Sequence, residues 1–367
     1  MSACRPGIVT RPTEVVQLFC GIDSHKDTLA ACLVDPAGRG QAAACFPNTP
    51  VGHRQLAAWL DQHATVTRVG IEGGANLGAA LARFLADAGI DVREIPGALT
   101  VRERRRLRRP GKSDPTDALA IARICARDAD LPPVRQAGLA EDLKVLSDYR
   151  DELLALRHAE GNRLHADLAI VCPGYAQVCP RLTAQRALAA ADQLLAGLPT
   201  VRAKVARRRI QRLYELDGEI GELADQLAKL VAASRTRLVD LVGVGPILAA
   251  RILGEVGDVA RFPDADHFAA ANGTAPIPVA SGRSDRHRLN RGGNRRLNRA
   301  LHYVALTQAT FEPRAVAYLA RKQAEGKTRR EALRCLKRRL STVVYNAIVA
   351  GPKPLPSPND PAIDPAA

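Results

Sequence analysis

The sequence predicts a mixed α/β domain at the start of the chain, then long helices and a mainly α-helical C-terminal domain. The N-terminal part alternates short apolar runs with amphipathic segments, as strands and helices do in a layered sheet domain. The middle repeats apolar residues at three- and four-residue spacing, which is typical of long helices. Further on, the turn GVGP separates two apolar helical segments and indicates a helix-hairpin-helix.

Changes in composition divide the 367 residues into four regions. The sheet domain is expected over 15–128, and two prolines between 128 and 137 mark its end. A helical linker is expected over 139–233. The C-terminal domain is expected over 236–350, and residues 351–367, with six prolines, are expected to be disordered. The linker has a possible coiled-coil seam at Leu143, Leu146, Leu153, Leu156 and Leu164.

The N-terminal region has a strand order that suggests a particular fold. Strands are expected over 15–22, 28–35, 40–47, 67–71 and 90–95, with helices over 49–63 and 74–88. Three meandering strands followed by alternating helices and strands fit an RNase H-like mixed sheet with helices on its faces.

Four acids occupy positions where such a sheet would bring them together. Asp23 ends the first strand, Glu72 ends the fourth, and Asp114 and Asp117 share one face of a helix opened by Pro115. Each acid alone has a plainer interpretation, as a helix cap, a hairpin end or a surface turn. Together they predict a metal site with two Mg²⁺ ions, about 3.5–4 Å apart, that clamp a phosphodiester.

A basic segment, RERRRLRR, lies between the last strand and the paired aspartates. As a helix it would be basic nearly all round, so it is either solvated or laid along a phosphate backbone. Its position beside the proposed metal site favours nucleic acid. The residues expected to contact it are Arg102, Arg104, Arg105, Arg106, Arg108 and Arg109.

The apolar pattern over 238–258 contains the second candidate for nucleic-acid contact. Its turn places Gly243 and Gly245 before a helix that starts at Ile247. Backbone N–H groups at such a helix start suit a DNA phosphate without base reading. A helical hairpin inside a bundle is the plainer alternative.

The segment 276–299 places one serine, Ser281, before Gly282 and seven arginines. A solvated basic loop is the plain interpretation, and a phosphate-binding segment with a nucleophilic serine is the functional one. Ser284 is a rival nucleophile. How the serine is activated stays open: His287 could act as a base, a metal ion could activate the hydroxyl, or nearby arginines could lower the pKa of that hydroxyl. The residues expected to contact nucleic acid here are Arg283, Arg286, Arg288, Arg291, Asn294, Arg295 and Arg296.

The whole composition favours an anionic partner. A formal charge of +15 and a pI near 9.9 suit nucleic acid, although an Ala- and Arg-rich bias accounts for part of the excess. The eight cysteines form no CxxC pair, which argues against zinc and a disulfide framework. Without a signal peptide or an apolar run of about 18 residues, the expectation is a cytoplasmic protein with no membrane partner.

Five segments together resemble the insertion-sequence transposases of the one-hundred-and-ten family. They are GIDSHKDTLAACLVD, GIEGG, KSDPTDALAIAR, LVGVGPILAARILGEVGD and NGTAPIPVASGRSDRHRLNRGGNRRLNRAL, and the resemblance runs from about residue 16 to residue 349. Many relatives have two serines before the glycine, where this chain has Ala280 and Ser281.

The resemblance implies a RuvC-like DEDD domain over 15–128, in which Asp23, Glu72, Asp114 and Asp117 bind Mg²⁺. It also implies a C-terminal transposase domain in which Ser281 attacks a DNA strand through a transient phosphoserine link. Family members excise and insert their element, and several are directed by a structured bridge RNA and assemble as tetramers. The expected partners are therefore DNA, at element ends and target, a guide RNA, and further copies of the chain as a dimer or tetramer.

Two other functions remain open from the sequence. A resolvase-like endonuclease would hydrolyse DNA at the carboxylates and use the serine segment only to hold phosphate. A non-catalytic scaffold would bind RNA or DNA without cleaving it.

Overall fold

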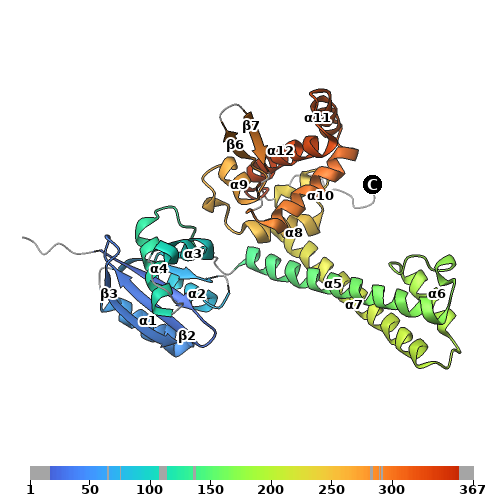
Figure 1. Ribbon diagram of the computed structural model, residues 1–367, viewed down its shortest axis with the longest axis horizontal. Coiled ribbons are helices and arrows are strands. Elements are labelled where there is room, and N and C mark those ends of the chain that lie inside the picture. Colours follow the sequence, from blue (N-terminus) through green and yellow to red (C-terminus); the bar gives the residue numbers. More distant parts are fainter. Residues whose placement is uncertain are drawn as a thin grey trace, which may run out of the picture. The chain divides into compact units, whose positions relative to one another are not determined.

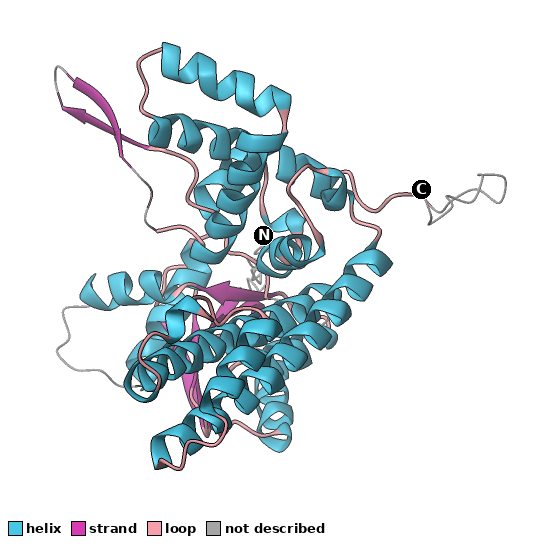
Figure 2. Ribbon diagram, turned by 90° about the vertical axis from the view of Figure 1, so that its right-hand side faces the viewer, coloured by secondary structure: helices cyan, strands magenta, loops and turns pink. Residues whose placement is uncertain are grey.

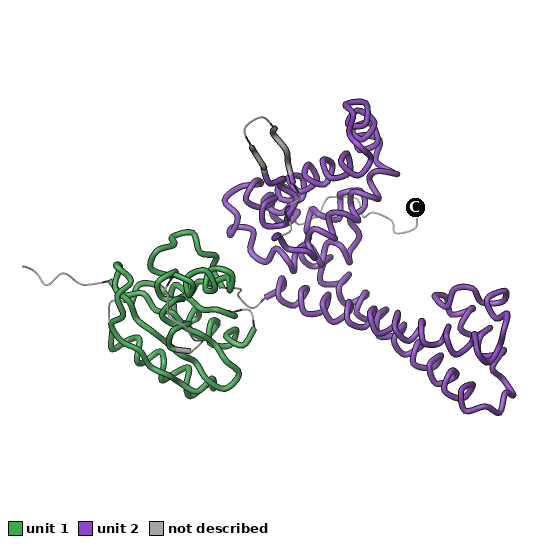
Figure 3. Tube along the Cα trace, in the orientation of Figure 1, with its two compact units in different colours: residues 1–137 green, residues 138–367 purple. Residues whose placement is uncertain are grey.

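The computed structural model describes residues 17–63, 66–74, 76–106, 114–134, 138–281, 284–288, 290 and 292–354. The chain forms two compact units, residues 1–137 and 138–367 (Figure 3). Several residues singled out above lie outside the described part: Arg108, Arg109, Gly282, Arg283, Arg291 and the tail from residue 355. The backbones of Asp114, Ser281 and Arg286 are described, but their side chains are not.

The first unit is the mixed sheet that the sequence predicts (Figure 1). Its elements are β1 (Leu18–Ser24), β2 (Thr28–Val34), β3 (Gly40–Pro47), α1 (Pro50–Asp61), β4 (Val66–Glu72), α2 (Ala79–Asp87), β5 (Val92–Ile95), α3 (Gly97–Arg106) and α4 (Asp114–Arg127). The strand order is β3-β2-β1-β4-β5. The first three strands are antiparallel, and β4 and β5 run parallel to β1. These are the order and directions of an RNase H-like sheet.

The two faces of this sheet bury different helices because side chains alternate along each strand. Cys20 and Ile22 of β1, with Val69 and Ile71 of β4, pack in one core with residues of α1 and α2. The opposite face packs against α4 through a second set of buried residues. Asp23 and Glu72 each follow a residue of the first core, so they belong to the face that α4 covers.

Gly21 sets how closely α4 lies on β1. A Cβ at this position would lie 2.1 Å from the backbone nitrogen of Ala122 and 2.4 Å from the carbonyl oxygen of Ala118. Only glycine permits backbone contact of this kind. The glycine of the GID segment therefore brings the helix that carries Asp117 directly onto the strand that ends in Asp23.

The second unit is mainly helical, with one two-stranded hairpin (Figure 2). Its elements are α5 (Leu139–Val171), η1 (Tyr175–Gln177), α6 (Gln185–Leu195), α7 (Val201–Ser234), η2 (Arg237–Asp240), α8 (Pro246–Val256), η3 (Val259–Arg261), α9 (Ala265–Ala271), β6 (Ile277–Ser281), β7 (Ser284–Arg288), α10 (Arg295–Phe311), α11 (Pro313–Ala324) and α12 (Arg329–Val349). No helix of the described residues is long and apolar enough to cross a membrane.

Helices α5 and α7 pack against each other and join two cores. Leu143 near the start of α5 shares a core with Leu227 near the end of α7, and with α8, α9, α10 and α12. Leu164 near the end of α5 packs with Ile210 of α7 and with α6. The two long helices are therefore antiparallel. Of the predicted seam, Leu156 is 51% exposed, so it lies outside the packed face.

Three local predictions differ from the structure. The segment before Gly243 is the four-residue 3₁₀ helix η2 instead of a short α-helix. Helix α2 begins at Ala79, later than the predicted residue 74, because the N–H groups of Asn76 and Gly78 both donate to the Gly73 carbonyl, as in a turn. The segment 276–299 contains a hairpin, which its arginine-rich sequence does not signal as strands.

Candidate active site

Asp23 and Glu72 lie side by side at the edge of the first sheet. They are Cα partners in the parallel ladder between β1 and β4. Asp23 is 8% exposed, and its Oδ2 lies 3.2 Å from His25 Nε2. A Cβ added at Gly97 would lie 2.8 Å from Glu72 Oε1, so the Glu72 carboxylate lies against the start of α3. Two of the predicted acids are thus brought together by strand register.

Asp117 lies in the first turns of α4 and is 4% exposed. Arg104 of α3 donates to both of its carboxylate oxygens, at 3.1 Å each. A buried carboxylate requires such compensation, since an unpaired charge away from water is costly. Arg104, which the sequence predicts as a nucleic-acid contact, therefore holds an acid of the candidate site. Asp114 begins α4 one turn earlier, where only its backbone is described.

The donor atoms at this edge suit a hard divalent cation, because carboxylate oxygens are the ligands that such ions prefer. Among side chains that the structure describes, no group of three or more acids, histidines or cysteines is already gathered as a metal cage. Asp117 is paired with Arg104, and the Asp114 side chain is outside this set. A cation that uses Asp117 would have to displace Arg104.

Helix α3 is less uniformly basic in its surroundings than its sequence suggests. Glu103 is 8% exposed and accepts from Arg127 Nη1 at 2.7 Å, with Arg106 at 3.5 Å. Arg102 and Arg105 are exposed. The helix thus has an inner side fixed by ion pairs and an outer side with free access to solvent, and only the outer side suits a phosphate backbone.

Ser281 ends β6 in the hairpin of the second unit. The antiparallel register pairs Ser281 with Ser284 and Ile277 with Arg288, and the two strands project from the helices (Figure 2). The two candidate nucleophiles are therefore cross-strand neighbours. Sequence spacing alone did not show this, because it does not reveal that the two segments pair.

The base of the hairpin is fixed backbone to backbone. Gly273 has φ of +72°, and a Cβ at Gly293 would lie 2.3 Å from the nitrogen of Gly273. The Asn294 N–H donates to the Ala271 carbonyl at 2.7 Å, and Asn290 Nδ2 donates to the Ala270 carbonyl at 3.1 Å. The chain before β6 and the chain after β7 are thus joined where they meet the helices.

Asn294 and Arg296 have partners inside the protein. Asn294 caps α10 by accepting from the N–H groups of Arg296 and Leu297, and its Nδ2 donates to Glu255 Oε2 at 2.6 Å. Arg296 Nη1 lies 2.5 Å from Asp148 Oδ2. Both residues were predicted to contact nucleic acid. Their pairing with these carboxylates could not be predicted, because the carboxylates lie far away in the sequence.

The GVGP turn has one packed and one open glycine. Gly243 has φ of +84°, and a Cβ there would lie 2.9 Å from Thr307 Cβ of α10. Gly245 caps α8 without a side-chain hydrogen bond, and a Cβ added there would meet no other atom within 4 Å. Packing against α10 is the role that the structure gives Gly243.

His25 is a residue of the first site that sequence reasoning passed over. Its ring nitrogen approaches Asp23, and the Asn48 side chain donates to its carbonyl at 2.9 Å. Its position could have indicated that it lies at the site, because His25 follows Asp23 by two residues, just after the end of the same strand.

Two family models match this chain. A model described as "Transposase" matches residues 20–173, which include Asp23, Glu72 and the paired aspartates, and "Transposase IS116/IS110/IS902 family" matches residues 235–320, which include the hairpin. The two models thus assign this chain to the transposase class of enzymes. Its RNase H-like sheet has carboxylates at its edge and is joined to a basic helical unit.

Relatives among known proteins agree with both matches. An insertion element IS900 protein of 42 kDa from Mycobacterium paratuberculosis is 30% identical over 74% of this chain and 79% of its own length. An IS110 protein from Streptomyces coelicolor is 27% identical over 91% and 94%. The chain belongs to the IS116/IS110/IS902 family of transposases.

Two more distant likenesses accompany these. The pilin gene-inverting protein of Moraxella bovis is 23% identical over 90% of this chain and 95% of its own length. A chain of T. thermophilus RuvC in complex with a Holliday junction substrate is 17% identical, with a TM-score of 0.24 over 29% of this chain and 90% of that chain. The fold assignment of the first unit rests on its strand order.

Proposed function

We propose that this transposase cleaves and rejoins DNA strands to excise and insert a mobile element, with a carboxylate metal site in the first unit and Ser281 as covalent nucleophile in the second. The observation that supports this most is the register of β1 and β4. It makes Asp23 and Glu72 neighbours on the face covered by α4, whose first turns carry Asp114 and Asp117.

In this proposal Asp23, Glu72, Asp114 and Asp117 hold two Mg²⁺ ions. When bound, such ions stabilise charge on the attacking and leaving oxygens of a phosphodiester. Arg104 holds the Asp117 carboxylate in place before the ions arrive, since it donates to both carboxylate oxygens. His25 lies against Asp23 and orients its carboxylate.

The Ser281 oxygen attacks a DNA phosphorus in the proposed covalent step. The serine hydroxyl gives up its proton as a bond forms between its oxygen and phosphorus, the bond to the leaving strand end breaks, and the leaving oxygen takes up a proton, so that the step is balanced. The phosphoserine link conserves the phosphodiester, so a hydroxyl of a second strand can displace the serine and complete joining. The fixed base of the hairpin supports this role because a nucleophile requires a rigid mount.

Substitution of each hairpin serine tests the nucleophile. With DNA that carries the element and its flanks, Ser281→Ala is expected to abolish the protein–DNA adduct seen after denaturation, and with it the joined products. Ser284→Ala is the matched control, since it removes the same hydroxyl from the paired residue and is expected to keep the adduct. Normal product strands from Ser281→Ala would refute the serine mechanism.

The rival endonuclease uses only the carboxylates. It predicts cleaved but unjoined DNA from Ser281→Ala, with water in place of serine. Asp23→Ala is expected to lose cleavage in both cases, and retained cleavage by Asp23→Ala in Mg²⁺ would exclude the metal site from the chemistry.

We also propose that a structured RNA guides the enzyme and that its working sites combine residues from different copies in a dimer or tetramer. The support is the family resemblance and, for RNA, the net charge of +15. RNA from the element's non-coding flank is expected to co-purify with the full chain. A mixture of Asp23→Ala and Ser281→Ala chains is expected to regain activity, and an active monomer would contradict the shared site.

A further inference from the structure

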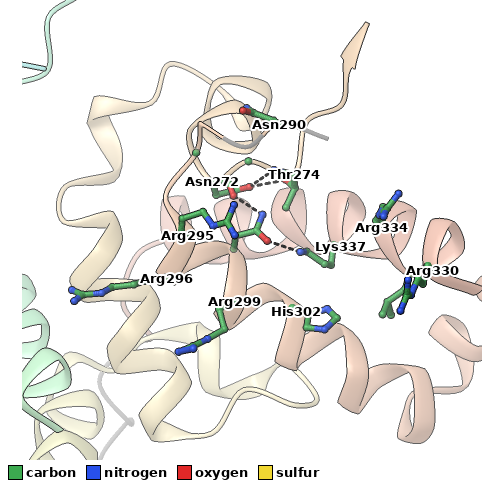
Figure 4. A pocket seen from close by; sticks show the side chains of 14 residues that line it. Asn272, Thr274, Asn290, Arg295, Arg296, Arg299, His302, Arg330, Arg334 and Lys337 are labelled. Atoms are coloured by element: carbon green, nitrogen blue, oxygen red, sulfur yellow. Dashed lines mark hydrogen bonds between the residues drawn. The ribbon is translucent and has the colours of Figure 1, made fainter. Parts of the chain in front are cut away.

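A cavity of about 880 Å³ lies beside the base of the β6–β7 hairpin (Figure 4). It is bordered by the end of α9, the loop after β7, and helices α10 and α12. Its volume is in the range of ligand-binding sites. The residues that line it include Arg295 and His302 of α10 and Arg330, Arg334 and Lys337 of α12, and none of those lining it is acidic.

Two more arginines of α10, Arg296 and Arg299, also line the cavity. Arg296 pairs with Asp148, and Arg338, next to Lys337 on α12, pairs with Asp266. Among residues whose side chains the structure describes, no ion pair with an acid joins the five other arginines and lysines of the lining, which are Arg295, Arg299, Arg330, Arg334 and Lys337. Most of the positive charge of this cavity is therefore without an ion-pair partner among the described side chains.

Two groups that line the cavity have pKa values below their usual range, first because of burial and then because of nearby positive charge. Burial, then Arg334 and Arg295, lowers the pKa of Lys337 below its usual range. Burial, then Lys337, lowers the pKa of His302. Groups that are held together against mutual repulsion are stabilised when an anion binds between them.

The cavity is also built in advance of any ligand. Lys337 Nζ donates to Asn298 Oδ1 at 2.7 Å, and Asn298 Nδ2 donates to the Asn272 carbonyl at 2.8 Å. Asn272 is fully buried and donates to Ser341 Oγ at 2.7 Å. Two linked amides, of which Asn272 is buried and Asn298 is partly buried, thus fix the lysine amino group, so little ordering remains to be done on binding.

We propose that this cavity binds consecutive phosphates of the DNA strand that passes to Ser281. Five arginine or lysine side chains without an ion pair exceed the charge of a single phosphate, so a polyanion suits the cavity better than a free ion. Thr274 lines the cavity three residues before β6 begins, and Gly293 lines it after β7 ends. A strand held there is thus led along the hairpin base. The inference rests on the proposed action of the hairpin on DNA.

The test compares two changes on α12 in the full chain. Arg334→Gln with Lys337→Gln removes two cavity charges, and the control Arg338→Gln removes a charge that Asp266 already compensates. Binding of DNA of mixed sequence is measured by fluorescence anisotropy across salt concentrations. The double variant is expected to weaken binding at least about tenfold and to reduce the salt slope by about two, and the control to leave both nearly unchanged.

Four results would overturn the inference. The first two are an equal loss of DNA affinity in the double variant and the control, and a loss of affinity for RNA of the same length without a loss for DNA. The third is displacement of DNA by inorganic phosphate beyond the effect of its ionic strength. The fourth is a double variant that is unfolded while Arg334→Gln alone binds DNA normally. Ser281→Ala separates this inference from the proposed function. If Ser281→Ala retains joining, the serine chemistry fails, while its DNA affinity and the α12 comparison still report on the cavity.

Discussion

A single missing Cβ, at Gly21, determines how α4 lies on the sheet, and through α4 where Asp117 lies. Gly21→Ala would place a carbon 2.1 Å from the Ala122 nitrogen, and backbone cannot give way as a flexible side chain can. We expect a loss of roughly 1–3 kcal/mol in the free energy of unfolding. Since the carboxylates would also separate, strand cleavage should fall by about a hundredfold.

The change in the free energy of unfolding is measured by thermal and urea unfolding of the full chain, with circular dichroism as the readout. The control is Gly40→Ala on β3 of the same sheet, where the nearest heavy atom to the new carbon is a Leu119 methyl carbon at 4.0 Å. Equal stability of the two variants would contradict the account of close packing by α4.

At the same scale, the sequence predicts some site residues and not the partners of others. That Asp23 and Glu72 are neighbours follows from the sequence, because each ends an apolar strand run and strand ends of parallel neighbours meet at one edge. The pairing of Arg104 with Asp117 was not predicted, because an arginine in a basic run gives no sign of which acid it meets. The hydrogen bond from Asn294 to Glu255 was not predicted for the same reason, since Glu255 comes from another helix.

Three helices of the second unit are joined by one buried carboxylate, Glu255 of α8. It accepts from Lys144 of α5 at 3.1 Å and from Asn294, the cap of α10, at 2.6 Å. Burial acts to raise the pKa of Glu255, but hydrogen bonds from Asn294 and Lys144 outweigh it and hold the pKa below its usual 4.5. The folded state therefore binds this proton less readily than the unfolded chain does.

The stabilisation from Glu255 is present above pH 4.5 and lost as the pH falls through the lower folded pKa. We expect Glu255→Gln to cost about 1.5–3 kcal/mol at neutral pH, as for a hydrogen bond to a charged group. The variant should also lose part of the pH dependence of unfolding below pH 4.5. Unfolding curves across this pH range provide the measurement.

Glu325→Gln on α11 is the control for this change. Its carboxylate meets Lys322 at the exposed surface, where ion pairs contribute little. A pH profile of Glu255→Gln that matches the original protein would contradict the role given to this carboxylate.

Elements differ in how well local sequence predicts them. Helices α5, α7, α10, α11 and α12 follow from apolar spacing, because each packs apolar residues of one face against a core. Strands β6 and β7 do not, because their pairing depends on contacts between α9 and the loop after β7 rather than on an alternating apolar face.

Each unit has its own hydrophobic core, so each is expected to fold alone. The cores around β1 to β5 use residues of 1–137 only, and the cores around α5 to α12 use residues of 138–367 only. Residues 1–137 and 138–367 expressed separately should both unfold cooperatively. An unfolded fragment, detected by circular dichroism or by amide exchange, would show that one core depends on the other unit.

At the scale of the whole molecule, composition indicated the class of partner but not where it binds. The net charge of +15 is spread over many arginines, and a large share of them meet acids within the fold. Only the pairing of each cation shows which remain available. The five cavity cations of α10 and α12 were therefore not distinguishable in the sequence from Arg296 or Arg338.

The contact between Gly273 and Gly293 has a consequence for how this protein can change. Since the two feet of the hairpin touch, the chain between them is a closed loop, and the entropy of closing such a loop grows only with the logarithm of its length. Doubling its length would cost about 0.6 kcal/mol. The hairpin can therefore gain or lose residues at its tip without endangering the helical core, so its length and the packing of the core are independent of each other.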